Sequence, residues 1–276
     1  MIALIEPEAP RLGEAAGEPL ILAAIQALAK TMGPGLRREL WLVVEDEPPG
    51  DPRREGIHQG ESCRDGSSWE DPIREQPPTG AICCTEYGIL ATAAGGDPAR
   101  EVAAFLSMMG PLPATVDGGL ARLLPGEWQR FPVLRYEGKK PGSIHLRAPS
   151  VMELADCNIA AGAAPPAARD ELYAELHLRV RRGAAQVCLV PGEDGGPAAG
   201  ACFLLGRECA VIGYLACPPE KRGRGYGSAA LSAAVRGAME QGKVPLLACG
   251  EELIPFYIGR GFVPAGEVYE RQGTRH

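Results

Sequence analysis

The chain has 276 residues, of which 45% are hydrophobic and 23% charged, and its formal net charge is -7. This composition is typical of a globular protein in water, and the length suits two domains of ordinary size. No apolar run approaches the roughly 20 residues of a membrane span, and an acidic chain is a poor general partner for nucleic acid. The N-terminal residues lack the basic start and apolar centre of a secretory signal, so we expect a cytoplasmic protein.

The cysteines predict neither a disulfide framework nor a metal site. Their number, nine, is odd, they form no CxxC pair, and a disulfide between the adjacent Cys83 and Cys84 would be strained. None of the four histidines lies at a spacing that would activate a cysteine nucleophile. We therefore expect reduced, mainly buried thiols.

The first half of the chain alternates helix and strand patterns. It predicts a helix over residues 18–32, a strand over 39–44, a strand region over 81–94 that is bent or broken near 86–88, and a helix to residue 110 with Asp97 as its N-cap. Residues 47–80 are rich in proline, glycine and charge, which predicts a mobile surface insertion. We interpret residues 1–140 as an α/β domain, joined to residues 141–276 by a connection over 124–142.

The second half begins with a predicted helix over 170–182 and three strands, over 186–190, 198–205 and 208–217. A helix over 225–241, a strand over 244–249, a helix over 251–258 and a final strand over 262–269 follow. Arg179, Arg181 and Arg182 end the first of these helices; they suit the helix dipole as a solvated end, with an anion site as the less favoured alternative.

A basic, glycine-rich run follows the predicted strand over 208–217 and opens a helix; it reads Arg222, Gly223, Arg224, Gly225, Tyr226, Gly227. Glycines let backbone approach a ligand, and the free N–H groups of a first helical turn favour an anion. The run therefore predicts a diphosphate site. It lacks the Gly-Lys-Ser/Thr of a Walker A loop, and its glycines alternate as GxGxG rather than GxGxxG.

Arg222, Gly225 and Gly227 match the R/Q-x-x-G-x-G/A signature of the GNAT superfamily of N-acetyltransferases, and residues 256–262, FYIGRGF, resemble its FYxxxGF landmark. The chain resembles this family over about residues 145–272. The resemblance implies an α/β (α+β) fold, a mixed, splayed sheet flanked by helices. The smaller α/β domain before it is either a degenerate GNAT-like copy, which we favour, or an unrelated substrate-shaping domain.

The same resemblance implies the site residues. Backbone groups of Leu215, Ala216 and Cys217 would pair with the pantetheine arm of acetyl-CoA, the co-substrate, and the amides from Arg222 to Ser228 would hold its diphosphate. Tyr257 matches the family's tyrosine acid. For the general base, Glu251 and Glu252 are the candidates, although acidic residues in a first helical turn are also favoured by the helix dipole alone.

We therefore expect an acetyl-CoA-dependent N-acetyltransferase that acts on a primary amine of a small molecule or peptide by direct attack. The alternative is a catalytically weak acyl-CoA-binding sensor or scaffold. No metal, nucleic acid or membrane partner is expected, and a homodimer is left open. The acceptor is not named by the sequence, since fold-level analogy does not identify it.

Overall fold

A computed structural model of the protein describes residues 2–4, 12, 14–31, 39–43, 77–85, 88–110 and 112–271. Apart from residues 77–80, the insertion expected over 47–80 lies outside the described residues. No helix in the described ranges is long and apolar enough to cross a membrane.

The described strands form one 11-stranded mixed sheet in the order β1-β2-β3-β4-β5-β11-β6-β10-β9-β8-β7. The strands are β1 (Ile2–Leu4), β2 (Glu39–Val43), β3 (Gly80–Thr85), β4 (Gly88–Ala93), β5 (Ala114–Asp117), β6 (Gln129–Tyr136), β7 (Ala185–Pro191), β8 (Pro197–Leu205), β9 (Cys209–Ala216), β10 (Val244–Ala248) and β11 (Phe262–Arg271).

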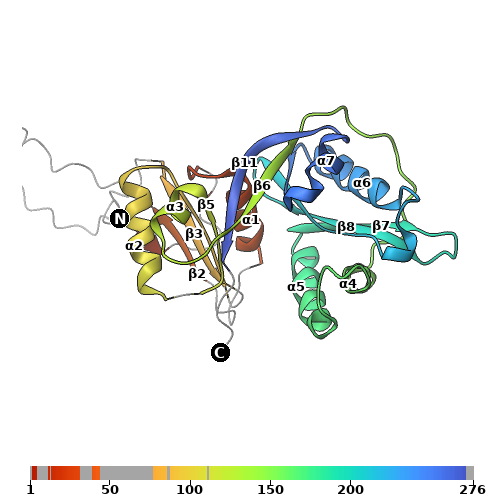
Figure 1. Ribbon diagram of the computed structural model, residues 1–276, viewed down its shortest axis with the longest axis horizontal. Helices are drawn as coiled ribbons and strands as arrows, with labels where there is room; N and C mark the ends of the chain where they lie inside the picture. Colours follow the sequence, from red (N-terminus) through yellow and green to blue (C-terminus); the bar gives the residue numbers. More distant parts are fainter. Residues whose placement is uncertain are drawn as a thin grey trace, which may run out of the picture.

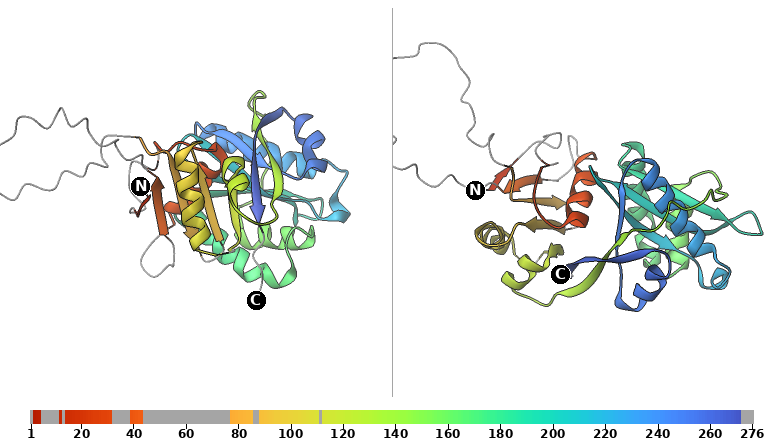
Figure 2. Two further views of the ribbon diagram at one scale, coloured as in Figure 1. Left: turned by 60° about the vertical axis from the view of Figure 1, so that its left-hand side comes forward. Right: turned by 90° about the horizontal axis from the view of Figure 1, so that it is seen from above.

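Helices cover both faces of this sheet, as Figures 1 and 2 show. They are α1 (Pro19–Ala29), α2 (Asp97–Met108), α3 (Gly118–Leu123), α4 (Val151–Ala160), α5 (Arg169–Arg181), α6 (Tyr226–Glu240) and α7 (Ile254–Ile258), with short 3-10 turns η3 (Pro166–Ala168), η4 (Pro219–Lys221) and η5 (Glu251–Leu253). In the second half, α6 and α7 lie on one side of β7 and β8, and α4 and α5 on the other.

Helix α1 lies between the two halves of the molecule (Figure 1). Its buried Ile21 and Ile25 belong to one apolar cluster with Leu40 of the first half and Leu246 of the second. Burial of a large aliphatic side chain is worth about 1.5–3 kcal/mol, so this helix joins the halves through a shared core.

The two halves repeat one order of elements. In each, three antiparallel strands are followed by helix, parallel strand, helix and a last strand: β2-β3-β4-α2-β5-α3-β6, then β7-β8-β9-α6-β10-α7-β11. The last strands are exchanged between halves, because β11 pairs with β5 and β6 pairs with β10. The domain boundary near residue 140 stays a prediction.

The parallel strands of the second half splay apart. β9 and β10 pair over three positions, which end at Val211 and Leu246, although β9 continues to Ala216. In the first half the corresponding gap between β4 and β5 is closed by Asp117. Its Oδ2 accepts hydrogen bonds from Thr92 Oγ1 at 2.8 Å and from the Ala93 N–H at 2.9 Å. A side chain therefore occupies the position that stays open in the second half.

Three expectations are corrected. The connection predicted over 124–142 contains β6, a central strand. Proline is unfavourable within a strand, and Pro132 of β6 lies beside a register shift of β11 between Pro264 and Gly266. Helix α4 was not predicted, although Ser150 and Glu153 have the spacing of a capping box and the Ser150 hydroxyl accepts from the Glu153 N–H at 3.3 Å. The N-cap of α2 is Gly96, so Asp97 lies within the first turn.

Candidate active site

A cavity of about 720 Å³ opens where β9 and β10 splay apart. Its walls are the end of β9, the start of α6, helix α7 and the turn after α4. Most of the residues expected to bind acetyl-CoA line it: Leu215, Ala216, Cys217, Arg222, Gly223, Gly225, Tyr226, Gly227 and Ser228, with Tyr257 also in the wall. Ala161, Ala163, Leu253, Phe256 and Arg260 complete it.

The N-terminus of α6 faces this cavity with its N–H groups free of side-chain caps. Gly223 and Gly225 have φ of +77° and +84°, a left-handed conformation that disfavours other residues, and Gly225 is the N-cap. The first turn carries no acidic residue, whereas Glu18 caps α1 and Asp117 caps α3. The 15-residue helix thus directs its positive dipole end and open donors toward the cavity.

Lys221 and the two arginines of the glycine-rich run that follows it make contacts within the protein. Lys221 Nζ lies 3.2 Å from Asp194 Oδ2 of the β7–β8 hairpin, and Arg224 lies 3.9 Å from Glu193 of the same hairpin. Arg222 donates to the carbonyl oxygens of Cys217 at 3.0 Å and of Ala161 at 3.1 Å. Arg222 therefore fixes the loop, and Arg224, unlike the other residues expected in the diphosphate site, is not among the cavity's lining residues.

Arg260 is a basic lining residue to which the sequence pattern assigned no role. Its guanidinium donates to Ser228 Oγ at 2.7 and 2.9 Å and to the Phe256 carbonyl oxygen at 2.7 Å, and it stacks 3.8 Å from the centre of the Phe256 ring. These contacts hold a positive charge beside the first turn of α6. The sequence could have indicated this residue, because Arg260 lies within the FYIGRGF segment.

Tyr257 is well suited to hold a proton at this cavity. It is 7% exposed, and its ring packs at 5.0 Å from Phe256 and 5.7 Å from Phe262, measured between ring centres. Burial, with a smaller effect of Cys249, raises the pKa of Tyr257 to about 12. The phenol is therefore protonated at neutral pH and is able to act as an acid.

The nearby thiols are poor nucleophiles. Burial raises the pKa of Cys217, which lines the cavity, and of Cys249, which follows β10. Because the thiolate is the reactive form, a raised pKa lowers reactivity at neutral pH. Both side chains pack in one apolar cluster, where Cys249 is buried and Cys217 half-buried.

The two candidate bases are not among the lining residues of the cavity. Glu251 accepts a hydrogen bond from Arg130 Nη2 at 2.5 Å on the exposed surface, and both glutamates lie in η5 with exposed side chains. Glu251 thus joins η5 to β6. A catalytic role for Glu251 or Glu252 stays a prediction.

The end of β9 is irregular where it meets the cavity. The β8–β9 register shifts between Gly200 and Cys202, and Tyr214 opposite this shift has φ of +54°, a strained value for a non-glycine residue. Asn158 of α4 donates to the Tyr214 carbonyl oxygen at 3.3 Å, and Arg179 of α5 donates to its hydroxyl at 3.1 Å. Arg179, expected at a solvated helix end, is instead 7% exposed.

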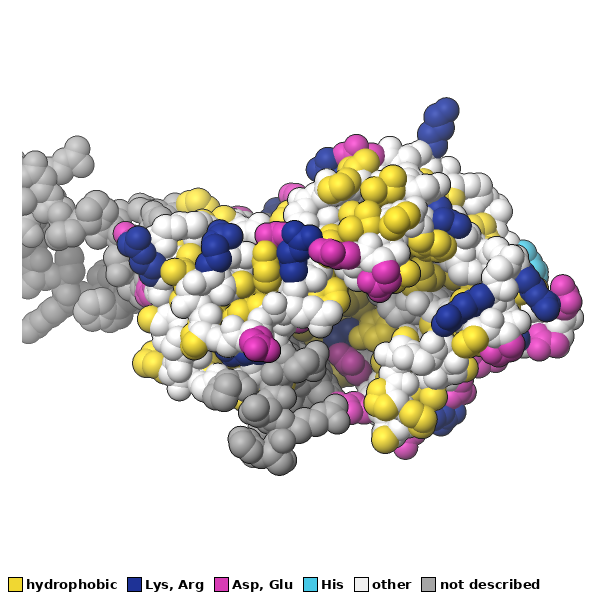
Figure 3. Space-filling view, viewed as in Figure 1, with side chains coloured by type: hydrophobic (Ala, Val, Ile, Leu, Met, Phe, Trp, Pro, Cys, Tyr) yellow, Lys and Arg dark blue, Asp and Glu magenta, His cyan; other side chains and the backbone are white. Residues whose placement is uncertain are grey.

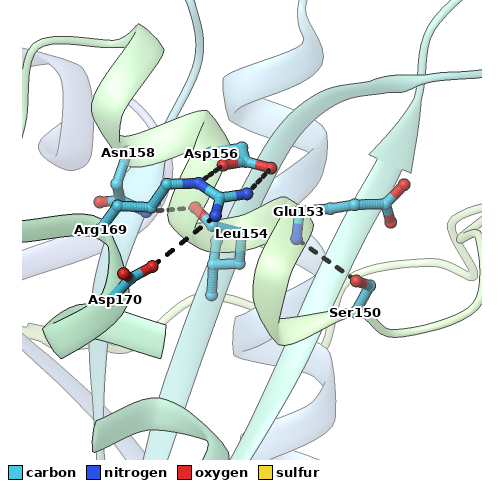
Figure 4. A network of polar contacts seen from close by, with 7 residues as sticks. All are labelled: Ser150, Glu153, Leu154, Asp156, Asn158, Arg169 and Asp170. Atoms are coloured by element: carbon cyan, nitrogen blue, oxygen red, sulfur yellow. Dashed lines mark hydrogen bonds and ion pairs between the residues drawn. The ribbon is translucent and has the colours of Figure 1, made fainter. Parts of the chain in front are cut away.

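Helices α4 and α5 are joined to each other as well (Figure 4). Arg169, the first residue of α5, donates to both carboxylate oxygens of Asp156 on α4, at 2.6 and 3.1 Å. Asn158 also donates to the Leu154 carbonyl oxygen at 2.9 Å within α4. The pair of helices that supports the irregular end of β9 is thereby held as a unit.

Comparison with known proteins finds the family described as "Acetyltransferase (GNAT) family" over residues 154–262. No curated protein sequence matches the chain. Among solved structures, a tandem GNAT protein from the clavulanic acid biosynthesis pathway is similar over 100% of this chain and 99% of its own, with 11% identity and a TM-score of 0.52.

Two further solved structures are similar over the larger part of the chain. A GNAT-family acetyltransferase from Colwellia psychrerythraea covers 71% of this chain and 82% of its own, with 14% identity and a TM-score of 0.50. A putative GNAT acetyltransferase from Novosphingobium aromaticivorans covers 70% and 89%, with 18% identity and a TM-score of 0.50. The likeness confirms the splayed mixed sheet and, through the tandem protein, a GNAT-like first half.

Proposed function

We propose that this chain transfers an acetyl group from acetyl-CoA to a primary amine of a small molecule or peptide by direct attack, a proposal supported by the match of residues 154–262 to the acetyltransferase (GNAT) family. The observation that carries the proposal is the 720 Å³ cavity with an uncapped helix N-terminus at one end and a protonated, buried tyrosine in its wall.

The residues present fit acetyl-CoA. A diphosphate at the start of α6 would accept hydrogen bonds from the free N–H groups of its first turn, with Arg260 supplying positive charge beside them. Among the described residues, the edge of β9 that faces β10 has no partner strand beyond Val211, so the backbone of Leu215 and Ala216 is able to pair with the amides of the pantetheine arm.

Bound acetyl-CoA would supply the activated acetyl group and a thiolate leaving group. Tyr257, in the cavity wall, would supply the proton that such a leaving group needs; its phenol is protonated at neutral pH, and the burial that raises its pKa also makes it a weaker acid than an exposed tyrosine. The protonated state of Cys217 and Cys249 argues against an acetylated cysteine and for direct attack by the amine.

One observation favours the alternative, a catalytically weak acyl-CoA-binding sensor or scaffold. No aspartate or glutamate is among the described residues that line the cavity, so a carboxylate base is not at hand there. A base reached through water, or supplied from beyond this cavity, is needed for turnover.

The first experiment compares thermal stabilisation by coenzyme A, ATP and NAD, followed by thiol release from acetyl-CoA with a panel of amines. Gly225→Val forces a branched residue into φ of +84° at the N-cap and should abolish the coenzyme A shift. Gly110→Val is the matched control, since Gly110 has φ of +82° and similarly open surroundings in the first half.

Stabilisation by coenzyme A with thiol release supports the enzyme. Stabilisation without release for any amine supports the sensor. A larger shift with ATP or NAD than with coenzyme A contradicts both.

A further inference from the structure

A second cavity, of about 300 Å³, lies between the two halves of the molecule. Helix α5 forms one wall, and the ends of β5 and β11 form another. Figure 3 shows a hollow between the halves where acidic and basic side chains come together. Three charged lining residues carry the inference: Glu175, Arg179 and Glu270.

Arg179 offers an unused donor in this wall. Its Nη1 donates to the Tyr214 hydroxyl at 3.1 Å, and its Nη2 donates to Glu175. Its Nε is buried and has no hydrogen-bond partner among the described residues. A buried N–H group without a partner is costly, so this atom favours a ligand that brings an oxygen to it.

Glu270 offers an unused acceptor in the same cavity. It lies on β11 two residues after the buried Val268, so both side chains lie on one face of the strand. No ion pair or hydrogen bond of its carboxylate is found among the described residues. The adjacent Arg271 donates to the carbonyl oxygens of Leu112 and Pro125 instead. A partly buried carboxylate without a cationic partner favours a ligand that carries a positive charge.

The second cavity is linked to the first through one residue of β9. Tyr214 binds Arg179 through its hydroxyl, and the next residue, Leu215, lines the acetyl-CoA cavity. Helices α6 and α7 line the first cavity and α5 lines the second, and these helices lie on opposite sides of β7 and β8 (Figure 1). Because the two cavities have no described lining residue in common, a ligand in the second cavity would leave the lining of the acetyl-CoA cavity free.

Resting on the proposed function, we propose that this second cavity binds the acceptor through a zwitterionic head group of the α-amino acid class. Glu270 binds the cationic nitrogen of the head group, and Arg179 Nε donates to its carboxylate or carbonyl oxygen. The amine that is acetylated lies at the other end of the acceptor.

Three probes separate the two contacts. L-lysine has both charged groups of the head group, 6-aminohexanoate lacks the α-ammonium, and pentane-1,5-diamine lacks the carboxylate. In the intact chain, kcat/KM for lysine should exceed that for either truncated probe by about tenfold or more, since each charge-assisted contact is worth at least about 1.4 kcal/mol.

Glu270→Gln should lower kcat/KM for lysine and the diamine about tenfold and leave 6-aminohexanoate unchanged. Arg179→Lys removes Nε together with the contacts to Tyr214 and Glu175, so it should lower kcat/KM for lysine and 6-aminohexanoate about tenfold more than for the diamine; its melting temperature, measured beside the rates, shows whether the variant is folded. Glu267→Gln is the matched control, because Glu267 lies on the same strand but pairs with Arg130 on the surface.

Equal rates for the three probes in the intact chain, or an unchanged preference in Glu270→Gln, overturn this inference while acetyl transfer itself stands. If no amine is acetylated, titration calorimetry with lysine decides the cavity separately. Binding that Glu270→Gln abolishes supports the site, and absent or unaltered binding refutes it.

Discussion

Replacing Tyr257 with phenylalanine removes the hydroxyl and its proton but keeps the packing of the ring. The ring is 7% exposed and packs against Phe256 and Phe262, contacts that phenylalanine keeps. No hydrogen bond of the Tyr257 hydroxyl is found among the described residues, so its removal leaves no partner unpaired. We therefore expect the melting temperature to stay within about 2 °C of that of the parent chain.

The same change should lower kcat about 100-fold, because general acid catalysis contributes about 10²–10⁴ and 100-fold corresponds to about 2.7 kcal/mol in the barrier. The dissociation constant of acetyl-CoA should not change. With a pKa of about 12, Tyr257 keeps its proton across pH 7–9, so this group should give the parent rate no inflection there.

The assay is thiol release at saturating acetyl-CoA and amine, with equilibrium binding of coenzyme A measured beside it. A kcat within twofold of the parent value would refute the role of Tyr257 as the acid. Weaker coenzyme binding together with a lower melting temperature would instead assign the residue to packing.

Three further predictions concern binding and stability. Arg260→Met should weaken acetyl-CoA binding about tenfold in low salt and less at high salt, as equilibrium titration measures, whereas Arg100→Met, an equal charge loss on exposed α2, should not. Burial, with a smaller effect of Asp117, raises the pKa of Glu18 from 4.5 to about 7; its stabilising contribution is full below pH 4.5 and is lost as pH rises through 7. In urea unfolding, the free energy of unfolding of Glu18→Gln should therefore rise relative to that of the parent chain by up to about 3 kcal/mol between pH 5 and 8. A difference between the two proteins that does not change with pH would contradict this. Gly237→Ala would place a Cβ 2.7 Å from the buried Phe203 ring and should cost about 1–2 kcal/mol in the same assay, while equal stability would show that Phe203 moves freely.

Much of the second half could be predicted from local patterns. The strand, glycine-rich turn and helix around Gly225, and the short helix and strand around Tyr257, are each set by residues close together in the chain. Local sequence encodes such elements because hydrogen bonding, capping and glycine conformations act over a few residues. The resemblance of the two motifs to the GNAT superfamily then implied the fold.

The central strand β6 could not be predicted in the same way. Pro132 is unfavourable in a strand taken by itself, and β6 exists because β10 and β11, more than 100 residues later, supply its partners. The exchange of last strands between the halves follows from pairing over the whole sheet. It leaves no periodic signal in the sequence.

The sequence by itself determined the glycine-rich turn at the start of α6 and the place of Tyr257 in a short helix, because both depend on short motifs. Only the tertiary structure decided which charges reach the two cavities. Arg260 meets Ser228 across 32 residues and Arg179 meets Tyr214 across 35, while Glu251, close to the cavity in sequence, turns to Arg130. The interaction between charged or polar side chains depends on their distance in the folded chain. That distance is set by the packing of segments that are remote in sequence.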